Sequence, residues 1–95
     1  MIDGEIYALN SKPKVVFAYC EKGTCDTSFY VGVTSRGEAV ISRKECIYGM
    51  SFNSASHLAT EEERERFHSI LKSNGLVWNQ SNKVIIKDNK EIIKI

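Results

Sequence analysis

The sequence has no apolar run long enough to cross a bilayer, one proline and only three cysteines. A spanning helix needs about 20 mostly apolar residues, so the sequence offers no candidate for one. An odd number of cysteines fits reduced thiols in a reducing compartment better than a disulfide framework. The opening residues, MIDGEIYALN, are acidic where a secretory signal would be basic. These absences predict a cytoplasmic protein that does not contact membranes.

The chain also lacks an excess of charge, because 13 Lys and Arg residues face 12 Asp and Glu residues. A domain that binds nucleic acid through bulk charge usually has a basic face, so the balance argues against a general nucleic-acid binder. The C-terminal part alone is basic, with Lys72, Lys83, Lys87, Lys90 and Lys94 against Asp88 and Glu91. Ninety-five residues without a break in composition predict a single domain, residues 1–95.

Motifs that indicate catalysis are absent. There is no phosphate-binding glycine loop, carboxylate cluster or serine nucleophile motif. Thiol catalysis would need a histidine close to a cysteine, and the available pairing is Cys46 with His57 or His68. Nothing local predicts a lowered thiol pKa for Cys46. The sequence therefore predicts neither an enzyme nor a cofactor.

Candidate metal ligands are few and poorly spaced. Strong zinc motifs are paired C-x-x-C units, whereas Cys20 and Cys25 are separated by four residues. A site would have to be completed from a distance by Cys46 and His57. Buried or reduced thiols are the preferred interpretation, and a structural zinc site on these four residues stays open as the alternative.

The stretch from Thr60 to Trp78 carries the clearest local signals. Thr60 and Glu63 form a capping box, and three glutamates in the first turn suit the positive end of the helix dipole. Gly75 suits the left-handed residue that closes a helix. These signals predict a helix over about 60–74, with a short apolar face made by Phe67, Ile70 and Leu71.

The rest of the chain predicts β-strands. Short runs of β-branched and aromatic residues alternate with turn residues. The expected strands are Gly4–Leu9, Lys14–Cys20, Thr27–Thr34, Glu38–Arg43, a brief Cys46–Tyr48, Leu76–Trp78 and Lys83–Lys87, with a last strand after a turn at Asn89-Lys90.

Apolar matching predicts the register of the hairpins. A three-residue loop at 35–37 sets Val33 opposite Ala39 and Val31 opposite Ile41. A turn at Asn89-Lys90 sets Ile86 opposite Ile93 and Val84 opposite Ile95.

A five-residue loop between the second and third strands unites their apolar sets on one face. It sets Val15, Phe17 and Tyr19 beside Val31, Phe29 and Thr27. This register places Cys25 in the loop and away from Cys20, so we expect no disulfide between them. It also puts Phe29, Val31 and Val33 on the core face and Tyr30 on the other.

The expected architecture is an α+β domain. The front half is an antiparallel β-meander curled as a small barrel-like sheet, followed by the helix and a C-terminal β-hairpin.

The second half carries a resemblance. The segments Cys46-Ile47-Tyr48, His57-Leu58-Ala59-Thr60, Glu61-Glu62-Glu63 and Gly75-x-x-Trp78 resemble a group of small prophage and mobile-element proteins of anaerobic gut bacteria. That group combines a β-rich front half with a C-terminal helix that begins Ala-Thr-x-Glu-Glu and ends Gly-x-x-Trp. The resemblance implies a mobile-element origin and no particular activity.

Two functional hypotheses follow. The leading one is a non-enzymatic cytoplasmic interaction module with a protein partner. The alternative is a nucleic-acid-binding accessory domain in which the exposed ring of Tyr30 stacks on bases. Its phosphate contacts would come from Lys83, Lys87 and Lys94, with Lys14 beside them.

Overall fold

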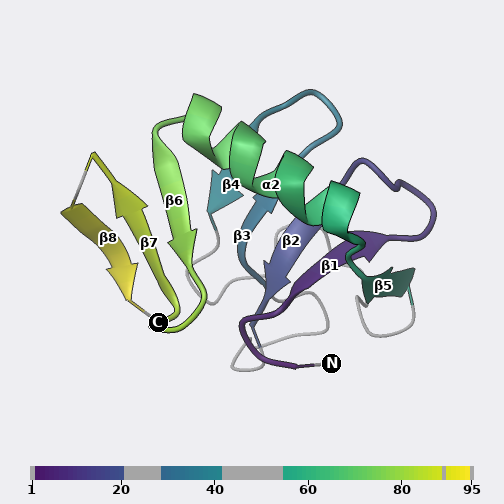
Figure 1. The fold of residues 1–95 in the computed structure, drawn as a ribbon, viewed down its shortest axis with the longest axis horizontal. Coiled ribbons are helices and arrows are strands. Elements are labelled where there is room, and N and C mark those ends of the chain that lie inside the picture. Colours follow the sequence, from purple (N-terminus) through teal and green to yellow (C-terminus); the bar gives the residue numbers. More distant parts are fainter. Residues whose placement is uncertain (1, 21–28, 42–54, 89, 95) are drawn as a thin grey trace.

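The computed structural model describes residues 2–20, 29–41, 55–88 and 90–94, and for 91–94 it describes the backbone alone. In these residues helix α2 lies across one face of an antiparallel sheet, and a second, smaller sheet follows the helix (Figure 1). The strands are β1 (Ile6–Leu9), β2 (Val16–Tyr19), β3 (Phe29–Val33), β4 (Ala39–Ile41), β5 (Ser56–Leu58), β6 (Leu76–Asn79), β7 (Val84–Lys87) and β8 (Lys90–Lys94), and the helix is α2 (Glu61–Ser73).

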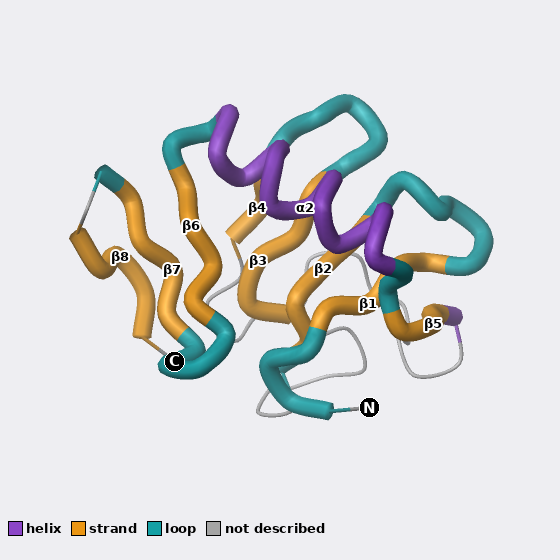
Figure 2. Tube along the Cα trace, in the orientation of Figure 1, coloured by secondary structure: helices purple, strands orange, loops and turns teal. Residues whose placement is uncertain are grey.

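The predicted α+β class is confirmed, but the predicted barrel-like closure is wrong. The main sheet has the order β4-β3-β2-β1-β5, so the first four strands form the expected meander. It stays open, with β4 and β5 at opposite edges (Figure 2). Helix α2 covers one apolar face, and the sheet therefore does not need to curl over itself to bury that face. The predicted strand Cys46–Tyr48 lies outside the described residues, and β5 forms where a surface loop was expected.

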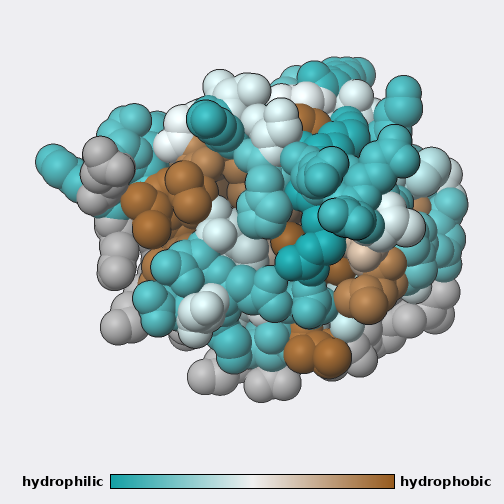
Figure 3. All heavy atoms as spheres, in the orientation of Figure 1, coloured by the Kyte–Doolittle hydropathy of each residue, from teal (hydrophilic) through white to brown (hydrophobic). Residues whose placement is uncertain are grey.

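Helix α2 begins and ends as predicted. The Thr60 hydroxyl accepts from the Glu63 amide at 3.2 Å, and the Glu63 carboxylate accepts from the Thr60 amide at 2.8 Å. Gly75 follows the C-cap with a φ of +73°. Phe67 and Leu71 are fully buried, while hydrophilic side chains cover the outer surface of the helix (Figure 3).

The main sheet buries side chains on both faces. The face beneath the helix carries small and branched residues, which pack with Phe67, Leu71 and two residues of β6, Leu76 and Trp78. The opposite face carries a separate aromatic cluster made of Tyr7, Leu9, Phe17 and Phe29. Along β1, Ile6 and Ala8 face the helix and Tyr7 and Leu9 face the other way, because side chains of a strand alternate between its two faces.

The register between β2 and β3 differs from the prediction. Ala18 lies opposite Val31 but Tyr19 lies opposite Phe29, so Tyr30 is an extra residue in β3. Such a bulge turns a side chain to the other face. Phe29 therefore shares a face with Phe17, as expected, whereas Val31 and Val33 lie on the helix side, against the prediction.

The two other predicted hairpins have different outcomes. The β3–β4 hairpin has the predicted pairs, Val33 with Ala39 and Val31 with Ile41. In the β7–β8 hairpin Lys87 lies opposite Lys90, so Ile86 lies opposite Glu91, and beyond a shift between Ile85 and Ile86 the residue opposite Val84 is Lys94. The predicted pairing of Ile86 with Ile93 is therefore wrong.

An ion pair fixes the start of β1 to the N-terminal part of helix α2. Arg64 donates to the Glu5 carboxylate, which also accepts from the Gln80 side chain at 3.4 Å. Burial raises the pKa of Glu5, but hydrogen bonds from the Ile6 amide and from Arg64 outweigh it and lower the pKa below its ordinary 4.5.

The Glu5 ion pair predicts a pH-dependent stability. Because the pKa of Glu5 is lower in the folded chain than in the unfolded chain, its stabilisation is present above pH 4.5 and is lost as pH falls. Glu5→Gln should lower the free energy of unfolding by about 1 kcal/mol at neutral pH. The difference should shrink at about pH 3. Urea unfolding at both pH values measures it, with the exposed Glu65→Gln as control. An equal loss at both pH values would contradict this assignment.

Candidate functional site

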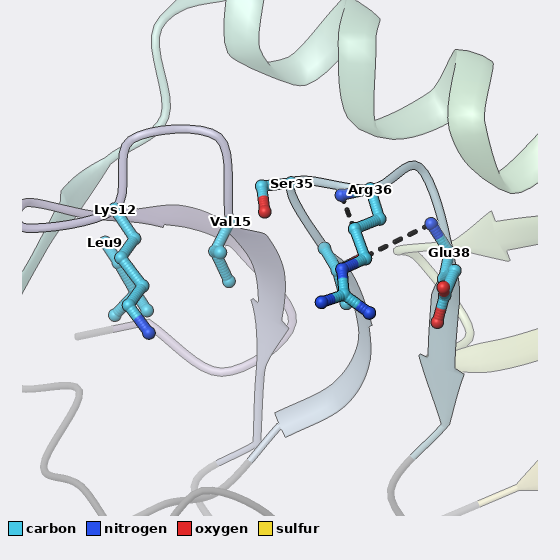
Figure 4. A pocket seen from close by; sticks show the side chains of 7 residues that line it. Leu9, Lys12, Val15, Ser35, Arg36 and Glu38 are labelled. Atoms are coloured by element: carbon cyan, nitrogen blue, oxygen red, sulfur yellow. Dashed lines mark hydrogen bonds between the residues drawn. The ribbon is translucent and has the colours of Figure 1, made fainter.

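A pocket lies at one end of the main sheet, between the β1–β2 loop and the β3–β4 loop (Figure 4). It has a volume of about 390 Å³ and adjoins a hollow of about 400 Å³ through two shared residues, Lys12 and Ser35. We call the two together the loop pocket. Its described lining residues are Leu9, Lys12, Pro13, Lys14, Val15, Thr34, Ser35, Arg36 and Glu38.

The β3–β4 loop is built by local hydrogen bonds that its sequence dictates. The Thr34 hydroxyl accepts from the amides of Arg36 and Glu38 at 3.3 and 3.2 Å (Figure 4). The Gly37 amide donates to the Thr34 carbonyl, and Gly37 has a φ of +79°, which a side chain would oppose. The side chains of Ser35, Arg36 and Glu38 are thus held at the rim by a fixed backbone.

The β1–β2 loop is closed in the same manner. The Val15 amide donates to the Lys12 carbonyl at 2.8 Å, and the Leu9 amide donates to the Val15 carbonyl at 3.0 Å. Leu9 is only 2% exposed and Val15 is half-buried, so together they form an apolar floor.

Arg66 of α2 connects the two loops. Its guanidinium donates to the Lys14 carbonyl at 2.6 Å and reaches the Thr34 carbonyl at 3.4 Å. A single helical side chain therefore sets the spacing of both walls of the loop pocket. It also adds a positive charge next to the loops.

The charges of the loop pocket are uneven. Lys12, Lys14 and Arg36 are exposed on its rim, and Glu38 at one end is the only acidic residue among the described lining residues. None of the described lining residues is a histidine, a cysteine or an aromatic residue. The loop pocket can therefore attract anionic groups over an apolar floor, but it offers no nucleophile with a base.

His57 lies near the start of the β1–β2 loop. Its Nδ1 is 2.6 Å from the Asn10 side-chain oxygen, and its Nε2 is 3.1 Å from a Glu63 oxygen. Burial raises the pKa of Glu63, while hydrogen bonds from the Thr60 amide and from His57 outweigh it and lower the pKa. The histidine thus links the loop to the helix cap, and the predicted thiol partner, Cys46, lies outside the described residues.

The predicted nucleic-acid residues do not form one surface. The prediction that Tyr30 faces away from the core is wrong, because the bulge turns it inward, where it is 1% exposed and its ring centroid lies 4.9 Å from that of Trp78. Its hydroxyl donates to Asp3 at 3.0 Å, and Lys83 pairs with the other oxygen of that carboxylate. Lys87 is exposed, and the side chain of Lys94 lies outside the described part of the chain. A ring buried in the core cannot stack on a base.

The metal-site residues are described in part. Cys20 is a buried residue of the core beneath the helix, and Cys25 and Cys46 lie outside the described residues. Within the described ranges, no three His, Cys, Asp or Glu side chains gather closely enough to hold a metal ion. Over the same ranges, no helix has the length and hydropathy needed to span a bilayer.

Comparison of the chain with models of protein families, with curated proteins and with solved structures gave no match.

Sequence reasoning named Lys14 but missed Lys12, Arg36 and Arg66 as members of one site. The signal that could have found them is topological. In an antiparallel meander the first and third connections lie at the same end of the sheet, so the basic residues of 10–15 and 34–38 must be neighbours. Arg66 had no comparable signal, since its role depends on how the helix crosses the sheet.

The two hydrogen bonds of Arg66 predict a measurable effect on the loops. Arg66→Leu should speed hydrogen exchange at the Val15 and Gly37 amides roughly fivefold, because about 1 kcal/mol of restraint is lost. Amides of β2 and β3 should change less. NMR-detected exchange measures both, and Lys72→Leu, an exposed change on the same helix, is the control. Unchanged loop protection in the Arg66 variant would show that the loops hold their positions alone.

Proposed function

We propose that this chain is a non-enzymatic cytoplasmic interaction module that binds a partner protein at the loop pocket. The observation that carries the proposal is a preformed recess between two loops, braced by a side chain of the helix and rimmed by exposed charges. Binding sites of this kind are concave, largely pre-formed and lined by apolar groups with a few placed polar ones. The cytoplasmic location and the mobile-element origin enter as predictions from the sequence.

Preorganisation supports binding at this place over other surfaces. Both walls are fixed by hydrogen bonds within their own loops, to backbone carbonyls and to the Thr34 hydroxyl, so a ligand does not have to order them at the moment of binding. Elsewhere in the described chain the exposed large apolar residues are Ile2, which precedes β1, Leu58 of β5 and Val77 of β6.

The burial of Tyr30 and the pairing of Lys83 weigh against the nucleic-acid alternative in its predicted form. They leave it without its stacking ring and with one phosphate contact already occupied by Asp3. The protein-binding hypothesis uses residues that are exposed and gathered at one end of the sheet.

The test is selection from a library of random displayed peptides on the full chain, followed by mapping of the enriched peptides on the ¹⁵N-labelled protein. Enriched peptides should shift the amide signals of residues 9–15 and 34–38. Ser35→Trp, which fills the loop pocket, should weaken their binding about tenfold, or ~1.4 kcal/mol. Ser69→Trp, the same change on the exposed surface of α2, should leave binding unchanged.

Two results would contradict the proposal. One is the absence of any peptide enriched over the Ser35→Trp variant. The other is a set of enriched peptides whose shifts map to β6–β8 or another surface and that bind Ser35→Trp as well as the original chain.

A further inference from the structure

Resting on that proposed function, we propose that the ligand of the loop pocket is an acidic segment of the partner protein, bound in extended form. An apolar side chain of the segment lies on Leu9 and Val15, and the flanking carboxylates meet Lys12, Lys14 and Arg36. The structure thereby assigns a ligand class to the site.

The pairing of the basic residues supports this class. Arg64 and Lys83 form ion pairs with Glu5 and Asp3 inside the fold. In contrast, the side chains of Lys12, Lys14 and Arg36 form no ion pair with any residue in the described ranges.

These three cations project from two loops that Arg66, itself a cation, holds together. Like charges gathered around one recess raise the local concentration of anions and favour a partner that brings carboxylates. The charge complementarity therefore selects an acidic partner.

The floor and the size of the loop pocket favour a peptide over a nucleic acid. The part of the loop pocket above the apolar floor has a volume of about 390 Å³, within the range of ligand pockets, and can take apolar side chains of a peptide. Single-stranded nucleic acid is bound on aromatic stacking platforms, and the described lining residues include no aromatic ring.

The position of Glu38 predicts how the peptide is oriented in the loop pocket. It stands at the far end from Lys12, with Arg36 between them (Figure 4). A continuous chain of phosphates would meet this carboxylate, whereas a peptide can place an uncharged or basic residue there. A segment whose acidic residues lie toward Lys12, Lys14 and Arg36, and whose end at Glu38 is uncharged or basic, is therefore the best match.

The experiment uses the full chain and four labelled synthetic peptides of equal length. One has the core Asp-Glu-Leu-Asp, one is its amide analogue Asn-Gln-Leu-Asn, one replaces the leucine by glycine, and one is the basic Lys-Lys-Leu-Lys. An oligothymidine of equal charge to the first peptide is the fifth ligand. Fluorescence anisotropy at two salt concentrations gives the affinities, and ¹⁵N spectra give the place of binding.

The acidic leucine peptide should bind roughly two- to fivefold more tightly per carboxylate than its amide analogue at low salt. This advantage should shrink at high salt because the contacts are exposed. The glycine version should bind more weakly than the leucine version, since it leaves the floor uncovered. The spectra should place the shifts at residues 9–15 and 34–38.

Charge reversal gives the sharper readout. Lys12→Glu combined with Arg36→Glu should abolish the preference for the acidic peptide and create a preference for the basic one, a gain that misfolding could not produce. Lys72→Glu combined with Lys87→Glu makes the same change in net charge at exposed positions elsewhere and should keep the original preference.

The remaining outcomes separate the ligand class from the proposed function. Equal binding of the acidic and amide peptides at the loop pocket would overturn the acidic ligand and leave the interaction module standing. Tighter binding of the oligothymidine there would overturn it in favour of a nucleic-acid site. If neither these peptides nor the library peptides shift the loop signals, both proposals fail.

Discussion

The fold depends on a buried contact in which the N-terminal segment joins the two sheets. Trp78 of the small sheet packs against the ring of Tyr30 of the main sheet, and its indole N–H donates to the Gly4 carbonyl at 3.3 Å. The adjacent Asp3 accepts from the Tyr30 hydroxyl and pairs with Lys83. Because a buried polar group without a partner is costly, these bonds fix how the two sheets pack.

The loop pocket lies at the other end of β1 from this contact, and it depends on the position of helix α2. Helix α2 is held on the main sheet by Phe67 and Leu71 and by the ion pair of Arg64 with Glu5. With the helix fixed, Arg66 extends beyond the sheet and bonds to carbonyls of two loops. The loop pocket therefore depends both on the core, which positions Arg66, and on hydrogen bonds within each loop, including those to the Thr34 hydroxyl.

The basic side chains have different environments in different parts of the fold. Within the described residues, basic groups that pair lie between elements, where they fix the packing, whereas those of the loop pocket project from loops toward solvent. The total charge of the chain is close to zero, but positive charge is in excess around the loop pocket. Whole-chain composition gives the total charge of the chain, but it cannot show where positive charge gathers on the folded surface.

Local chemistry alone determined the helix with its caps, the α+β class and the tight β3–β4 hairpin. Thr60 and Glu63 are three residues apart, and Thr34 contacts amides within its own loop, so no distant partner is needed. Tertiary structure decided the inward turn of Tyr30, the open sheet and the meeting of Lys12, Arg36 and Arg66. Each of these depends on groups far apart in the chain, such as Tyr30 and Trp78, whose packing outweighs the local preference of a strand for a regular register.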